Sequence, residues 1–128
     1  MLLVDTDLKP SPIAGVGVYL KAPVKAGDLV WQFDGRVDRI LAPKDIDGLP
    51  EHTRDYMIRH TCWHAASDVH AFWGDNAKFL NHADDPNLTF EGPAFGDARA
   101  VRDIAAGEEL TCDYAEVCDW VKQNGNRF

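Results

Sequence analysis

The stretch from Gly74 to Tyr114 decides how the rest of this sequence is interpreted. It begins GDNAKFLNHADDPN at Gly74 and, after ten variable residues, closes ARAVRDIAAGEELTCDY at Tyr114. The first half is rich in polar and turn-forming residues. The second half holds two strand-like runs, 98–101 and 110–114, around a Gly-Glu-Glu turn, and we predict that they pair as a hairpin. A polar loop beside a strand that ends in tyrosine indicates a functional site.

The chain has the size and composition of one globular domain. Its 128 residues lie near the commonest domain length, and 45% of them are hydrophobic, which suffices for a substantial core. No apolar run approaches the roughly 20 residues of a membrane span, and the first residues lack the features of a secretion signal. We expect one domain over 1–128, with a core at about 10–115 and a tail at 116–128, located in the cytoplasm and not on a membrane.

Acidic residues outnumber basic ones, 21 to 13, for a formal net charge of −8. This balance argues against direct binding of nucleic acid, because broad phosphate contacts need clustered Lys and Arg. It suits a basic partner, such as a peptide rich in Lys and Arg. The same acidity would also serve merely to keep the protein soluble, so both interpretations stay open.

The pattern of apolar residues indicates many short strands and little helix. Short strands are expected at 1–8, 16–20, 29–33, 68–74 and 88–91. Pro50 opens the one convincing helix, at about 50–60, and residues 40–48 before it are loop-like. The tail is either a short helix at about 116–123 or an ordered flap. The fold class is therefore mainly β (α+β), with long loops and one short helix.

Three local patterns have competing interpretations. Gly15 and Gly17 leave the backbone bare for a close ligand, or they mark a glycine bulge in a strand. His60 and His64 would share a helix face and hold a metal, but no carboxylate base or cysteine pair is nearby, which favours a packed or solvated pair. Cys112 is better explained as a core thiol than as a nucleophile. The odd, sparse cysteine count fits reduced thiols.

Three motifs, taken in order, resemble the SET domain of protein lysine methyltransferases over nearly the whole chain. They are Gly15-Val16-Gly17, then Phe79-Leu80-Asn81-His82 followed by Pro86-Asn87, and finally Gly107-Glu108-Glu109-Leu110-Thr111 closing on Asp113-Tyr114. The last two are specific together, because their separation also fits. The resemblance implies a SET-domain β-clip fold of small curled sheets, in which the C-terminal segment threads under a loop to make a pseudoknot.

The resemblance also implies a cofactor and a set of site residues. The cofactor is S-adenosylmethionine, with no metal, and the substrate is a lysine side chain of a protein. Tyr114 is the implied catalytic residue, with its hydroxyl at the methyl-transfer channel. The implied cofactor-binding residues are Ala14, Gly15, Val16, Gly17, Asn81, His82, Tyr114 and Trp120. The implied substrate-channel residues are Phe33, Phe90 and Trp73.

Two positions bear on activity and product. Phe90 lies where the family carries the residue that regulates how many methyl groups are added, and phenylalanine there resembles members that make di- or trimethyl-lysine. Phe33 departs from the family, which often has a tyrosine at this place in a Tyr-x-Gly pattern. Asp84 replaces a zinc-binding cysteine of many members, and the tail lacks a Cys-x-Cys cluster, so a zinc-bound post-SET module is not expected.

The resemblance predicts an S-adenosylmethionine-dependent protein-lysine N-methyltransferase that acts on a histone or another basic protein. The alternative is a SET-like module that binds a basic peptide or the cofactor without turnover, which the Phe33 departure supports. The sequence does not distinguish a monomer from a homodimer that completes the peptide groove.

Overall fold

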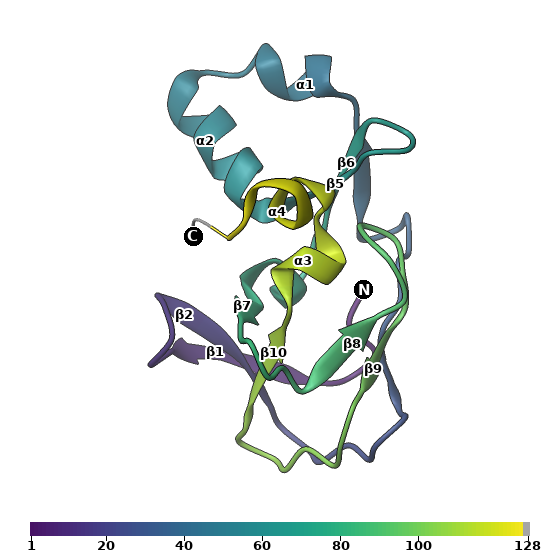
Figure 1. The fold of residues 1–128 in the computed structure, drawn as a ribbon. Helices are drawn as coiled ribbons and strands as arrows, with labels where there is room; N and C mark the ends of the chain where they lie inside the picture. The colour runs from purple at the N-terminus through teal and green to yellow at the C-terminus, as the bar shows by residue number, and fades with distance from the viewer. Residues whose placement is uncertain (127–128) are drawn as a thin grey trace.

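The computed structural model describes residues 1–126 as short strands in three small sheets, with several short helices (Figure 1). The strands are β1 Thr6–Pro10, β2 Val16–Leu20, β3 Leu29–Trp31, β4 Arg39–Leu41, β5 Thr61–His64, β6 Val69–Phe72, β7 Asn81–His82, β8 Leu88–Phe90, β9 Ala98–Ala100 and β10 Glu109–Cys112. The helices are α1 Pro43–Asp47, α2 Glu51–His60, the 3-10 helix η1 Asn76–Phe79, α3 Tyr114–Val117 and α4 Asp119–Asn124. The mainly β prediction is confirmed, although the helices are more numerous than the one expected.

The first sheet places the C-terminal strand between early and middle elements, in the order β1-β2-β10-β7. Strand β10 is antiparallel to β2 and parallel to β7, with Thr111 opposite Asn81 and Cys112 opposite His82. Asn87, at the far end of the same polar loop, also holds β10: its Nδ2 donates to Glu109 O at 2.8 Å, and Thr111 N donates to its Oδ1 at 2.8 Å. The C-terminal segment thus passes between β2 and the 81–87 loop, the threading that the pseudoknot prediction describes.

The second sheet, β3-β9-β8, corrects the predicted hairpin between 98–101 and 110–114. Strand β9 has β3 on one edge and β8 on the other, so no edge is left for β10. After β9 the chain runs beside an earlier segment, where Ile104 and Val24 exchange backbone hydrogen bonds of 2.9 and 3.0 Å. Gly107 has φ +84° and donates to Leu20 O at 2.7 Å, which directs the chain onto β2.

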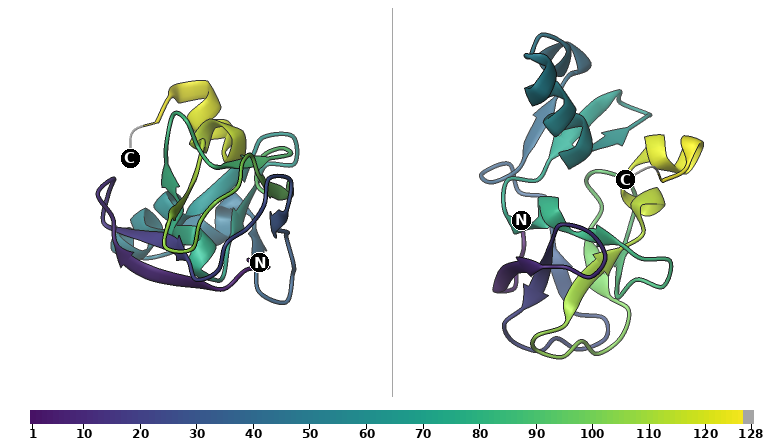
Figure 2. Two further views of the ribbon diagram at one scale, coloured as in Figure 1. Left: turned by 90° about the horizontal axis from the view of Figure 1, so that it is seen from below. Right: turned by 90° about the vertical axis from the view of Figure 1, so that its left-hand side faces the viewer.

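The third sheet, β4-β6-β5, belongs to residues 39–72, which also include α1 and α2 and are called the 39–72 unit below. The predicted helix at 50–60 is confirmed by α2. The segment at 40–48, predicted as loop, instead contains part of β4 and helix α1, which begins at Pro43, a residue suited to a first helical turn. The right-hand view of Figure 2 shows α1 and α2 at the top of the molecule and the purple β1–β2 hairpin in its lower half.

The core is built from apolar side chains of distant segments and draws on all three sheets. Val18, Trp31, Leu88 and Leu110 are fully buried there, and burial of such side chains is the main favourable term in folding. Cys112 is only 1% exposed, as expected for a core thiol. Within the described part of the chain, no helix has the length and apolarity needed to cross a membrane.

Candidate functional site

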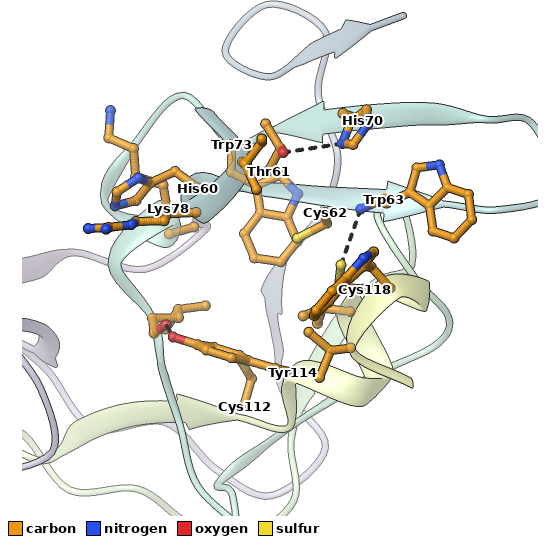
Figure 3. Close-up of a pocket in the computed structure, with 17 residues that line it drawn as sticks. His60, Thr61, Cys62, Trp63, His70, Trp73, Lys78, Cys112, Tyr114 and Cys118 are labelled. Atoms are coloured by element: carbon orange, nitrogen blue, oxygen red, sulfur yellow. Dashed lines mark hydrogen bonds between the residues drawn. The ribbon is translucent and has the colours of Figure 1, made fainter. Parts of the chain in front are cut away.

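Two neighbouring cavities lie where the three motifs converge. The outer cavity, of about 780 Å³, is lined by residues 13–16 of the β1–β2 loop, by residues 79–82 and by Tyr114. The inner cavity, of about 260 Å³, lies between β5, α3 and α4 (Figure 3). The residues that line both cavities are Arg59, His60, Lys78, Leu80 and Tyr114. The two cavities therefore adjoin each other at Tyr114 and Leu80.

Tyr114 is held in place by both its backbone and its side chain. It is the first residue of α3, directly after the N-cap Asp113, whose Oδ1 accepts from Ala115 N. Its hydroxyl donates to Leu80 O at 2.8 Å, and its backbone N donates to His82 Nδ1 at 3.1 Å. Burial, then the nearby Cys112, raise the pKa of the phenol above its usual value. Tyr114 is thus a protonated hydrogen-bond donor at neutral pH and not a base.

His82 fastens the polar loop to the start of α3. Because its Nδ1 accepts from Tyr114 N, the ring proton is assigned to Nε2, which lies 3.0 Å from Asp84 Oδ1. Its ring also packs against the Tyr114 ring, with 5.3 Å between centroids. The side chain therefore connects the loop with the helix that carries the tyrosine, and its edge lines the outer cavity.

Asn81 directs its side-chain amide at the loop that lines the outer cavity. Its Nδ2 lies 3.1 Å from Ala14 O, 3.1 Å from Val16 O and 2.9 Å from Glu109 Oε2. Among the predicted cofactor-binding residues, Ala14, Gly15, Val16, Asn81, His82 and Tyr114 line this one cavity. The motif residues are thus brought together, with Asn81 acting on the loop through hydrogen bonds.

The two glycines of the first motif have different physical roles. Gly15 has φ +47°, in the left-handed region, and a Cβ there would meet open space. Gly17 instead has no room for a side chain, because a Cβ would overlap the Glu109 carboxylate. Gly17 is not among the residues that line the outer cavity. Only the first glycine therefore acts at the cavity itself.

The three predicted channel aromatics separate into one that lines a cavity and two that support it. Trp73 lines the inner cavity, and its Nε1 donates to Ala94 O at 3.2 Å. Phe90 stacks on Trp73 with parallel rings and centroids 5.4 Å apart. Phe33 packs edge-on against Trp31 and Phe95. Neither Phe33 nor Phe90 lines either cavity: Phe90 lies directly against Trp73, and Phe33 is connected to it only through Trp31.

The C-terminal tail forms the helices α3 and α4, as one of the two predicted alternatives, and residues 127–128 of the tail lie outside the described range. Trp120, the tail aromatic chosen from sequence, lines the inner cavity with Val117 and Val121. Asp119 Oδ2 accepts from Ala65 N at 2.8 Å, which ties α4 to the turn after β5. Trp120 is therefore held against the inner cavity and is not among the residues that line the outer one.

Sequence reasoning missed two cations that line both cavities, Arg59 and Lys78. Neither forms an ion pair with a carboxylate within residues 1–126. The Lys78 Nζ lies over the Phe72 and Phe79 rings, at 5.1 and 5.5 Å. The only sequence signal was that Lys78 directly precedes the Phe-Leu-Asn-His motif. In a protein of net charge −8, these cations give the cavity rims a local positive character.

The predicted histidine pair is separated by the end of a helix. His60 ends α2 and stacks on Tyr56, whereas His64 ends β5 and its Nδ1 lies 2.6 Å from Ser67 Oγ. The shared helix face needed for a histidine metal site is thus absent at this place. Across the residues that the structure covers, no group of three or more His, Cys, Asp or Glu is arranged to hold a metal ion.

Comparison with known proteins agrees with this geometry. The family model described as SET domain matches residues 15–115. The chain is 32% identical over 113 residues to the human protein "Histone-lysine N-methyltransferase 2B", an alignment that covers 81% of this chain and 4% of that protein. The chain therefore spans only a small part of the length of this relative. Because the family match covers most of the chain and takes in all three motifs, the chain belongs to the SET domain family.

Proposed function

We propose that the protein is an S-adenosylmethionine-dependent protein-lysine N-methyltransferase. The observation that carries the proposal is the pair of cavities that adjoin at Tyr114 and Leu80. Transfer of a methyl group to an amine requires the two reactants to approach along one line, and holding them so is a large part of the catalysis. We assign the cofactor to the outer cavity and the lysine side chain to the inner one, so that the two would meet beside Tyr114.

The outer cavity suits S-adenosylmethionine in size and in chemistry. Its volume of about 780 Å³ falls in the range of small-molecule sites, roughly 300–1,000 Å³. Gly15 gives the ligand access to the bare backbone of the loop, and Arg59 and Lys78 are suited to a carboxylate such as that of a methionine moiety. When bound, the cofactor supplies a methyl group on a positive sulfur that is already a good electrophile.

The inner cavity suits an uncharged amine on an aliphatic chain. Its lining includes Trp73, Trp120, Val117 and Leu80. A lysine has a pKa of about 10.4 in water, so it must lose its proton before it accepts a methyl group. An apolar surrounding lowers the pKa of an amine by removing water from its charged form, and the Tyr114 hydroxyl lies at the junction of the two cavities. Placement and desolvation, and not a base, therefore carry the chemistry.

The substrate is proposed to be a lysine in a basic protein, of which a histone is one candidate. The acidic net charge of −8 favours association with a partner rich in Lys and Arg. The name of the human relative refers to histone lysine, and this supports including histones among the substrates tested.

The alternative is a SET-like module that binds its ligands without turnover. It is favoured by Phe33, which has no hydroxyl and packs behind the cavity against Trp31 and Phe95. The intact set of Asn81, His82 and Tyr114 around one cavity favours the enzyme instead.

The deciding experiment incubates the protein with labelled S-adenosylmethionine and either histones or a proteome extract, followed by mass spectrometry. Label on lysine, in mass steps of about 14 per methyl group, is expected for the enzyme. Cofactor binding in a thermal-shift assay with no labelled lysine would favour the binding module. If the protein shows no cofactor binding and no labelled lysine, the cofactor assignment itself is refuted.

A further inference from the structure

A carboxylate behind the outer cavity connects three separate segments of the chain. Glu109, the first residue of β10, accepts from Ser11 Oγ at 2.8 and 2.9 Å through its two oxygens. Its Oε2 also accepts from Asn81 Nδ2 at 2.9 Å, and Tyr19 OH lies 3.5 Å from Oε1. Glu109 is not among the residues that line either cavity, so any effect it has on a ligand must act through its partners.

Those partners hold the two ends of the loop that lines the outer cavity. Ser11 begins the loop, its Oγ accepts from Ile13 N at 3.0 Å, and its backbone N donates to Gly15 O at 2.9 Å. Asn81 reaches the other end, at Ala14 O and Val16 O. Glu109 therefore connects the residue that starts the loop with the residue that holds its far end.

The carboxylate of Glu109 also determines the orientation of the Asn81 side-chain amide. A carboxylate accepts hydrogen bonds but does not donate them, whereas an Asn side chain carries an acceptor on one side and donors on the other. Facing Glu109 Oε2 and two backbone carbonyls, the Asn81 amide must present its nitrogen. A flipped amide would set its oxygen against three acceptors and release the loop.

The absence of a side chain at Gly17 makes room for the Glu109 carboxylate. A Cβ on Gly17 would overlap Glu109 Oε2, so the second glycine of the first motif makes space for the carboxylate and not for a ligand. Two residues from different motifs, 92 positions apart in number (109 minus 17), are thus in direct steric contact.

We propose that Glu109 is a positioning residue for the cofactor. Through Ser11 and Asn81, Glu109 holds the loop 13–16 in the conformation that binds the cofactor. This inference rests on the proposed function and adds to it a residue that touches neither reactant. Loss of Glu109 should weaken cofactor binding while leaving the transfer step, once the cofactor is bound, nearly unchanged.

The test compares Glu109→Ala with Glu109→Gln and with Glu108→Ala. Glu108 is the adjacent acidic residue, with a side chain 40% exposed, and it caps a turn at Ala105 N away from both cavities. We expect E109A to raise the KM for S-adenosylmethionine about tenfold, the equivalent of about one lost charge-assisted hydrogen bond, with kcat within about twofold at saturating cofactor. E109Q, which keeps the shape and one acceptor, should recover much of the affinity, and E108A should match the wild type.

A second readout needs no catalysis. Hydrogen exchange of the amides of residues 13–16 in the ligand-free protein should be faster in E109A than in E108A or wild type. If the wild type neither binds nor transfers, the proposed function fails, and this exchange alone then judges the role of Glu109 in the loop. A folded E109A with unchanged KM and unchanged exchange overturns the inference, as does a loss confined to kcat. If E109A does not fold, Ser11→Ala replaces it, with a smaller change expected in the same direction.

Discussion

The two sides of the inner cavity are built in different ways. On one side, β10 and the 81–87 loop are joined by side chains that bond to distant backbone, such as Asn87 on Glu109 and Thr111. On the other side, the 39–72 unit pairs its three strands among themselves, and its helix α2 buries none of its residues. The side that carries Tyr114 is therefore held by polar contacts with distant backbone, whereas the opposite side pairs its strands within one unit and is joined to the tail by hydrogen bonds such as that from Ala65 N to Asp119. Under the function proposed above, the catalytic tyrosine lies on the first side and the helix α2, with no buried residue, lies on the second.

The largest effect is expected for Tyr114→Phe, on the side of the inner cavity held by long-range contacts. This variant removes the hydroxyl at the junction of the cavities and its hydrogen bond to Leu80 O. We expect methyl transfer to fall about 100-fold or more, the usual scale for losing a positioned donor, with cofactor affinity within about twofold. Transfer and binding of the purified variant are measured side by side. Normal turnover would remove Tyr114 from the mechanism.

Asn87→Ala tests the long-range polar contacts on the side of the inner cavity that carries Tyr114. It removes two hydrogen bonds to β10, one of them fully buried, and leaves the Thr111 amide without its partner. The free energy of unfolding is expected to fall by about 2–4 kcal/mol. The matched control is Asp55→Ala on the exposed face of α2, which should change it by less than about 0.5 kcal/mol. Urea unfolding measures both, and similar losses in the two variants would contradict the comparison.

The two sides of the inner cavity each contribute one buried thiol, and the dependence of the free energy of unfolding on alkaline pH compares them. Burial raises the pKa of Cys62, in the 39–72 unit, and of Cys112, in β10. A raised folded pKa means that both thiols stay protonated when folded but ionise when unfolded, so their contribution to stability is complete below pH 9 and is lost as pH rises. The free energy of unfolding should fall above pH 9 by up to about 1.4 kcal/mol per pH unit for each thiol.

Cys62→Ala and Cys112→Ala should each reduce this slope by the same amount, measured as urea unfolding under reducing conditions at several pH values. A slope that responds to Cys112→Ala but not to Cys62→Ala would show that the 39–72 unit opens to water before the rest. That result would extend the contrast between the two sides from their contacts to their motions.

The smallest expected effect concerns the aromatic layer behind Trp73. Phe90→Tyr adds a hydroxyl to a ring stacked on Trp73 and packed near Trp31. If this layer sets the space around the lysine, the products should shift a few-fold toward monomethyl-lysine, read by mass spectrometry on one peptide. An unchanged product ratio would contradict the proposal that this aromatic layer limits the space around the lysine. Phe90→Leu is the matched control, because it changes the packing without adding a polar atom.

Local pattern was enough to predict the parts of the fold whose reason is local. Alternation located β2, and Pro50 located the start of α2. The pairing of 98–101 with 110–114 was wrong because two strand-like runs beside a glycine turn do not reveal that β9 already has both edges occupied. Helix α1 was missed because five residues after a proline carry too little periodicity to be told from a loop.

The same limit applies to the candidate site. Residues with a recognisable motif, such as Asn81, His82 and Tyr114, were identified and do line one cavity. Arg59 lies in no motif and reaches the cavities only because α2 ends beside them. The places of Phe33 and Phe90 depend on ring packing with Trp31 and Trp73, which no spacing along the chain encodes.

The position of β10 inside its sheet also determines the order in which the molecule can be completed. Because β10 lies between β2 and β7, a nascent chain that has emerged only as far as residue 108 has a bare hairpin edge, an unanchored 81–87 loop and no wall between the cavities. Domains generally fold as units, so this domain is completed only after β10 has been translated. A chain that stops before β10 would also lack Tyr114, the residue at which the two cavities adjoin.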